Sequence, residues 1–95
     1  PYNTAKAGMI GFIKGCAKEY AGQGVTINAI APAVIRSPMV ESEPPSVVDY
    51  MISRIPMGRM GEPEEVAETL AFIVSKSCSF TTGFVFDASG GRATY

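Results

Sequence analysis

The sequence predicts an α/β fold with two parallel strands and three helices. Apolar residues near the start recur at three- and four-residue steps, the period of an amphipathic helix. A mostly apolar segment, residues 25–31, follows and suits a strand buried on both faces. A further helix then leads to a short strand at 84–86, and a right-handed crossover places the two strands side by side and parallel. Because two strands leave an open edge, we expect them to belong to a larger sheet.

The first helix is expected over residues 4–20, where Gly22 and Gly24 end it. Pro32 should stop the strand that follows. Residues 32–45 contain three more prolines, so we expect an irregular excursion there. Ser46 then caps a short, lid-like helix that runs to residue 54. The apolar positions of the first helix are Ala5, Met9, Phe12, Ile13, Cys16, Ala17 and Tyr20.

The clearest helix start is the segment G-E-P-E-E at residues 61–65. Its proline suits the first turn, and its carboxylates suit the positive end of the helix dipole. We interpret these glutamates as dipole and surface charges and expect the helix to run to about residue 75. Gly90 and Gly91 close the strand at 84–86. The helix has one predicted buried stripe, made of Val66, Leu70, Ile73 and Val74.

The charge balance excludes several classes of function. The 95 residues carry 8 basic and 9 acidic side chains and no basic cluster, so nucleic-acid or anionic-membrane binding is not expected. No apolar run approaches the roughly 20 residues of a membrane span, and the first residues lack the pattern of a signal peptide. We therefore expect a cytoplasmic protein. Cys16 and Cys78 form no C-x-x-C pair, and the chain has no histidine, so we expect reduced, buried thiols and no metal site.

Tyr2 and Lys6 are four residues apart at the start of the first helix, so both lie on one helix face. An ammonium group close to a phenol stabilises the phenolate and lowers its pKa, which makes the tyrosine a usable acid or base. The same spacing also suits a solvated surface pair, and Tyr50 with Arg54 repeats it.

The surrounding segments resemble the C-terminal part of the short-chain dehydrogenase/reductase family. The Tyr2 segment is similar to the family's Y-x-x-x-K helix, and residues 25–32 to the strand that enters its Pro-Gly turn. Residues 34–37 resemble the I-x-T sequence after that turn, residues 55–67 the opening of the penultimate helix, and residues 82–91 the closing strand. Together these motifs span nearly the whole chain, in the family's order.

The resemblance implies a Rossmann-like, doubly wound parallel sheet and an enzyme that uses NAD or NADP on a small carbonyl or alcohol substrate. Tyr2 would be the general acid/base, while Lys6 would lower its pKa and hold the nicotinamide ribose. The family's cofactor edge falls on Pro32, Val34, Ile35 and Ser37, and its substrate loop on residues 38–54, with Met39 and Val40 as substrate contacts. Family members form homodimers or homotetramers.

Two departures stand out: Ala33 replaces the usual glycine, and Ser89 precedes the final glycine pair. The family's glycine-rich turn and catalytic serine lie upstream of the tyrosine. We therefore expect residues 1–95 to be the C-terminal fragment of one Rossmann domain and to be inactive alone. The alternative is a truncated, non-catalytic module for oligomerisation or interaction. The cluster Met39, Met51, Met57 and Met60 suits either substrate contact or core packing.

Overall fold

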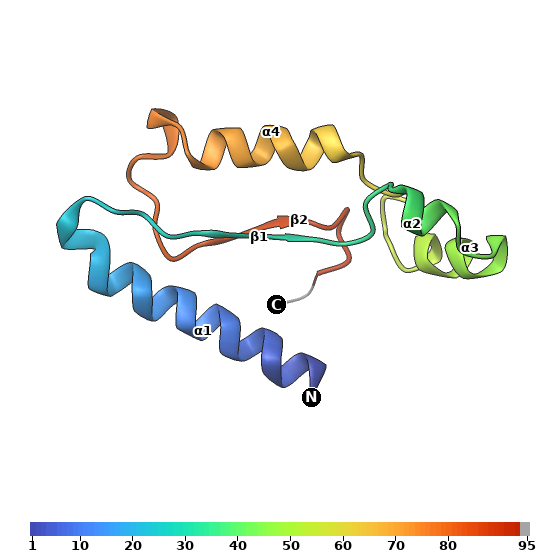
Figure 1. Cartoon of the computed structure of the whole chain (residues 1–95), viewed down its shortest axis with the longest axis horizontal. Coiled ribbons are helices and arrows are strands. Elements are labelled where there is room, and N and C mark those ends of the chain that lie inside the picture. Colours follow the sequence, from blue (N-terminus) through green and yellow to red (C-terminus); the bar gives the residue numbers. More distant parts are fainter. Residues whose placement is uncertain (94–95) are drawn as a thin grey trace. The chain divides into compact units, whose positions relative to one another are not determined.

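The computed structural model describes residues 1–93, apart from the side chains of residues 2 and 3. It confirms the α/β class (Figure 1). Three helices were expected, whereas the described residues form four α-helices, because α2 lies in the segment predicted to be irregular. The elements in order are α1 (Tyr2–Tyr20), η1 (Ala21–Gln23), β1 (Ala29–Pro32), α2 (Pro38–Glu41), α3 (Pro45–Ser53), α4 (Pro63–Ile73), η2 (Lys76–Cys78) and β2 (Val85–Ala88).

Strands β1 and β2 form a two-stranded parallel sheet, as the crossover argument predicted. The Ala29 N–H donates to Phe84 O at 2.9 Å, and the Ala33 N–H donates to Ala88 O at 3.4 Å. The two bonds keep the same offset along both strands, which is the pattern of parallel pairing. The expected strand limits were wrong: β1 starts four residues later than predicted and includes Pro32, and β2 extends to Ala88.

The late start of β1 is explained by the contacts of Asn28 with a distant turn. Its Nδ2 donates to Thr81 O at 3.1 Å, and its Oδ1 accepts the Phe84 N–H at 3.0 Å. The amide side chain thus takes the place of backbone pairing at the entrance to the sheet. Gly83 N–H also donates to Ile27 O at 2.7 Å, which ties residue 27 to the same turn.

The chain divides into two compact units, and the first unit comprises residues 1–30 and 72–86. Its most buried apolar side chains are Ala17, Ile73 and Cys78. Lys14 Nζ donates to Gly83 O at 2.9 Å and ties α1 to the turn before β2. The rings of Phe72, Phe84 and Phe86 pack edge to face, with centroid distances of 6.4 and 4.7 Å.

Several apolar side chains of the helices are exposed. On α1, Met9 is 64% exposed and Phe12 is 66% exposed; beyond α4, Val74, which was predicted to be buried, is 82% exposed. Leu70 is also exposed, so only Val66 and Ile73 of the predicted α4 stripe are covered. The amphipathic period is correct, but the described residues supply no further layer over these faces.

The second unit comprises residues 31–71 and the chain from residue 87 onward. Ile55 and Met60 are its buried apolar residues. Helix α3 begins at Pro45 without a side-chain cap, so the predicted Ser46 cap was wrong. Proline at the first helical position needs no partner for a backbone N–H, and the N-cap lies at Pro44, two residues earlier than expected.

Helix α4 ends at Ile73, two residues before the predicted end. The Ser75 hydroxyl donates to Phe72 O at 2.7 Å and accepts the Ser77 N–H at 3.2 Å. Ser75 therefore closes α4 and caps η2. None of the helices formed by the described residues is long and apolar enough to cross a membrane.

Candidate functional site

The predicted acid/base pair lies at the start of α1, in the first unit. The side chain of Tyr2 lies outside the described residues, so its contact with Lys6 stays a prediction. Lys6 is described and half-buried. Positions 2 and 6 are one turn apart on the helix, which places them on one face.

Another tyrosine of the chain, Tyr50, contacts a cation four residues further along the sequence. Tyr50 and Arg54 are also four residues apart, at the end of α3. Arg54 Nη1 donates to Tyr50 Oη at 3.3 Å, and the guanidinium carbon lies 5.9 Å from the ring centroid. Four-residue spacing at a helix therefore brings a phenol and a cation together in this protein.

The predicted cofactor edge continues from β1 into the second unit. Ile35 forms an isolated parallel bridge with Gly61. The Gly61 N–H donates to Val34 O at 2.9 Å, and the Arg36 N–H donates to Gly61 O at 2.8 Å. Val34 and Ile35 are half-buried, whereas Pro32 is exposed at the end of β1.

The bridge leaves the backbone N–H and C=O of Ile35 without a backbone partner among the described residues, and we call these two groups the Ile35 amide edge. Alternate residues in an extended chain direct their backbone groups to opposite sides, so the N–H and C=O of Ile35 point away from Gly61. Among the described residues, neither group has a backbone partner. A donor beside an acceptor is complementary to a carboxamide, so this segment fits the nicotinamide group that the resemblance implies.

The predicted substrate contacts lie on α2. Ser37 caps this helix, since its Oγ accepts the Val40 N–H at 3.2 Å. Met39 is 75% exposed, and Val40 is half-buried. The hydroxyl oxygen of Ser37 is thus used for the cap, while its hydrogen can still donate to a ligand.

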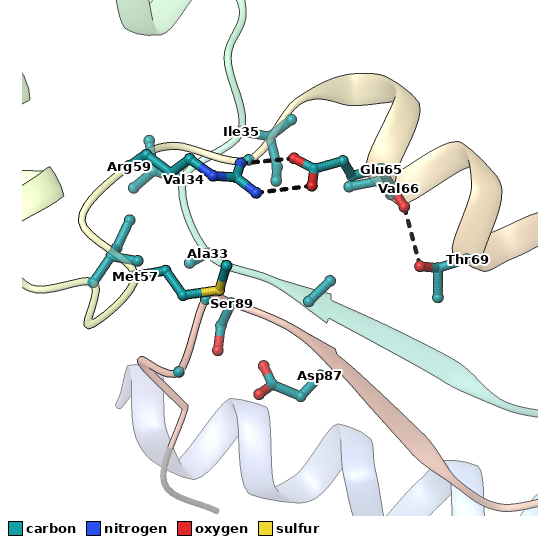
Figure 2. Close-up of a pocket in the computed structure, with 15 residues that line it drawn as sticks. Ala33, Val34, Ile35, Met57, Arg59, Glu65, Val66, Thr69, Asp87 and Ser89 are labelled. Atoms are coloured by element: carbon teal, nitrogen blue, oxygen red, sulfur yellow. Dashed lines mark hydrogen bonds and ion pairs between the residues drawn. The ribbon is translucent and has the colours of Figure 1, made fainter.

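A cavity of about 390 Å³ lies entirely within the second unit, a volume that suits a small molecule. Val34 and Ile35 line it, whereas Pro32, Ser37, Met39 and Val40 do not. Figure 2 shows its walls coming from four segments: residues 33–35, the loop that carries Met57 and Arg59, the first turns of α4, and the end of β2 with the residues after it. The structure therefore brings together only part of the predicted cofactor edge.

An ion pair forms one wall of the cavity (Figure 2). Arg59 Nη1 and Nη2 donate to the two Glu65 carboxylate oxygens at 2.8 and 3.0 Å. The Glu62 N–H also donates to Glu65 Oε1 at 2.9 Å, as in the reciprocal half of a capping box. The Arg59 hydrogen bond, followed by the Glu62 N–H, lowers the pKa of Glu65 to about 2.

Asp87 and Ser89 also line the cavity, and sequence reasoning gave them no ligand role. Asp87 is exposed, and its carboxylate makes no hydrogen bond or ion pair with the described residues; Figure 2 shows this carboxylate at the end of β2. Ser89 is buried, and its Oγ accepts the Ala93 N–H at 3.0 Å. Ser89 therefore fastens the chain after β2, a role that no local sequence signal indicated.

The polar side chains that line the cavity are those of Arg59, Glu65, Thr69, Asp87 and Ser89. Within residues 1–93, no group of three His, Cys, Asp or Glu side chains is placed to hold a metal ion. Both cysteines are unpaired thiols; Cys78 is buried as predicted, whereas Cys16 is only half-buried.

A family model described as Enoyl-(Acyl carrier protein) reductase matches residues 1–93. The chain is 53% identical over 94 residues to a 2-dehydro-3-deoxy-L-rhamnonate dehydrogenase (NAD(+)) of Sphingomonas sp. (strain SKA58), covering 99% of this chain and 38% of the relative. It is 46% identical to a 3-oxoacyl-[acyl-carrier-protein] reductase of Thermotoga maritima, with 95% of this chain and 37% of the relative covered.

An acetoacetyl-CoA reductase of Shinella zoogloeoides is 44% identical, with 96% of this chain and 38% of the relative covered. The chain thus spans less than two fifths of the length of the curated relatives that it matches. The family match over 1–93, together with relatives that are oxidoreductases, shows that the chain belongs to the short-chain dehydrogenase/reductase family.

Proposed function

We propose that the complete polypeptide carrying this chain is an NAD- or NADP-dependent oxidoreductase acting on a ketone or secondary alcohol. The observation that carries the proposal is the family match over residues 1–93, a range that includes the Tyr2-x-x-x-Lys6 spacing at the start of α1. A bound nicotinamide would supply the hydride or accept it. Tyr2 would exchange a proton with the substrate oxygen, and Lys6 would lower the pKa of the Tyr2 phenol.

The residue 33–37 segment is the proposed contact for the nicotinamide carboxamide. The Ile35 N–H and C=O point away from Gly61 and have no backbone partner among the described residues. The Ser37 hydroxyl hydrogen adds a second donor beside them. Pro32 and Val34 flank this edge, and Lys6 would hold the ribose hydroxyls.

The substrate class follows from the relatives by analogy. One relative is named for a 2-dehydro-3-deoxy sugar acid, and two are named for 3-oxoacyl thioesters. We propose a small oxo or hydroxy acid or its thioester as the substrate. Residues 38–54 would form the substrate segment, with exposed Met39 and half-buried Val40 supplying apolar contact.

The test uses the complete natural polypeptide, with NADH and NADPH, on acetoacetyl-CoA and 2-dehydro-3-deoxy sugar acids. Tyr2→Phe should lower kcat about 10²- to 10⁴-fold, the range for loss of a general acid. Tyr20→Phe is the matched control, because this tyrosine lies on the same helix, at its other end. Unchanged kcat in Tyr2→Phe, or an equal loss in both variants, would contradict the assignment.

A second candidate function is a non-catalytic association module, and the exposed apolar face of α1 favours it. Met9 and Phe12 are one turn apart and both are more than 60% exposed. A homodimer or homotetramer could bury them in either case. The two functions can be distinguished with the isolated 95-residue chain, from which we expect no turnover. A defined oligomer of this chain in light scattering would support the association module. A monomer would exclude the module.

A further inference from the structure

The bridge between Ile35 and Gly61 fixes where the amide edge of Ile35 faces. It consists of two backbone hydrogen bonds, at 2.9 and 2.8 Å, made by the residues on either side of Ile35. A Cβ on Gly61 would lie 2.7 Å from Ile35 Cδ1, so the two chain segments meet closely. A shift of one residue in this bridge would turn the Ile35 N–H and C=O toward the opposite side.

Arg36 holds this bridge to the start of α4. Its Nε donates to both carboxylate oxygens of Glu62, at 3.1 and 2.9 Å. Glu62 is itself anchored, because its N–H donates to Glu65 Oε1 at 2.9 Å in the first turn of the helix. Glu41 of α2 adds a weaker contact, with its oxygen 3.9 Å from Arg36 Nη1. Arg36 therefore joins three segments of the second unit.

Arg36 supports the groups proposed to contact the cofactor but is not itself one of them. Its guanidinium reaches Glu62, while Ile35 and Ser37 on either side carry the groups proposed to meet the cofactor. Arg36 does not line the cavity that Val34 and Ile35 help to form. A residue placed in this way affects binding by fixing the contacting groups before the ligand arrives.

We propose that Arg36, acting through Glu62, is a positioning residue that presets the Ile35 amide edge for the nicotinamide cofactor. This inference rests on the proposed function. Loss of the pair leaves the contacting atoms present but less fixed, so cofactor affinity falls while kcat at saturating cofactor changes little. Because the pair is partly exposed, we expect the effect to be about two- to fivefold.

The experiment titrates NADH and NADPH into the complete natural polypeptide and follows nicotinamide fluorescence. Arg36→Gln should weaken binding about two- to fivefold, and Arg36→Lys should recover part of the loss because it keeps the charge. Glu62→Ala should match Arg36→Gln, and the double variant should be no worse than either one, since the two residues act as one unit. Amide exchange at Gly61 should quicken in Arg36→Gln.

The control is Lys14→Gln, which removes a positive charge and an exposed hydrogen bond to Gly83 O, at a residue of the first unit that does not line the cavity. It should lower the urea midpoint and leave the dissociation constant unchanged. Equal dissociation constants for Arg36→Gln and the wild type would overturn the inference alone, as would equal weakening by Lys14→Gln. A wild type that binds neither dinucleotide would overturn the proposed function and this inference with it.

Discussion

Three glycines of the second unit allow backbone strain to be separated from steric contact. Gly58 has φ +75° and open space where a Cβ would lie, so alanine there meets strain alone. At Gly61, alanine would meet contact alone, because no positive φ accompanies its 2.7 Å approach to Ile35 Cδ1. Gly90 combines both features: φ is +64°, and a Cβ would lie 2.7 Å from Ile55 Cγ2.

The expected loss of unfolding free energy in each variant depends on whether the crowded side chain can move away. Left-handed backbone costs a non-glycine residue about 1–2 kcal/mol, which is the expected cost of Gly58→Ala. Ile35 Cδ1 is a terminal methyl that can rotate away, for about 0.5–1.5 kcal/mol in Gly61→Ala. Ile55 is 4% exposed, and its Cγ2 is fixed to the branched Cβ, so crowding adds about 1–3 kcal/mol. Gly90→Ala should therefore cost about 2–5 kcal/mol in total.

The assay is urea unfolding of the complete polypeptide, with free energies of unfolding taken from the midpoint and slope. Gly22→Ala serves as the control, because it has no positive φ and nothing within 4 Å of the added carbon. It should be neutral or slightly stabilising. A cost for Gly90→Ala no larger than that for Gly58→Ala would refute the steric reasoning, and so would a cost for Gly61→Ala that exceeds both.

Two further predictions concern hydrogen bonds in the two units. Asn28→Ala removes the bonds to Thr81 O and the Phe84 N–H and should lower the free energy of unfolding by about 1–3 kcal/mol in urea unfolding; a loss below about 0.5 kcal/mol would contradict this. Glu65→Gln removes a carboxylate whose pKa is lowered from 4.5 to about 2, so the wild type gains stability above pH 4.5 and loses that gain as the pH falls toward 2. The difference in unfolding free energy between wild type and Glu65→Gln should shrink over that interval, and a difference that is constant with pH would exclude the charge as its source.

Local signals were sufficient for the type and order of most elements. Helical periodicity predicted α1, and the proline with its carboxylates predicted the start of α4. Helix α2 was missed, although Ser37 followed by Pro38 is a helix-start signal, because the abundance of proline favoured a loop. The late start of β1 could not be predicted, because it depends on Asn28 meeting a turn more than 50 residues away.

The candidate site, too, could be predicted only in part from the sequence. Tyr2 and Lys6 were predicted because their four-residue spacing is about one helix turn, and the pair stays a prediction. The cavity is different: Met57, Thr69 and Asp87 come from three separate segments, and no local pattern relates them. The pair of Arg59 and Glu65 likewise joins a loop to a helix, at a spacing that no regular element would bring together.

Pro32 has a consequence for how other chains meet the sheet. The backbone N–H groups of residue 29 in β1 and of residue 33, just after it, face β2, so the backbone of Pro32 faces the other edge. Proline has no N–H to offer there, and two residues later the same edge is occupied by Gly61. A further strand of a larger sheet can therefore accept a backbone hydrogen bond from Ile30 but none from Pro32. Pro32 thus limits how far regular pairing can extend along this edge of β1.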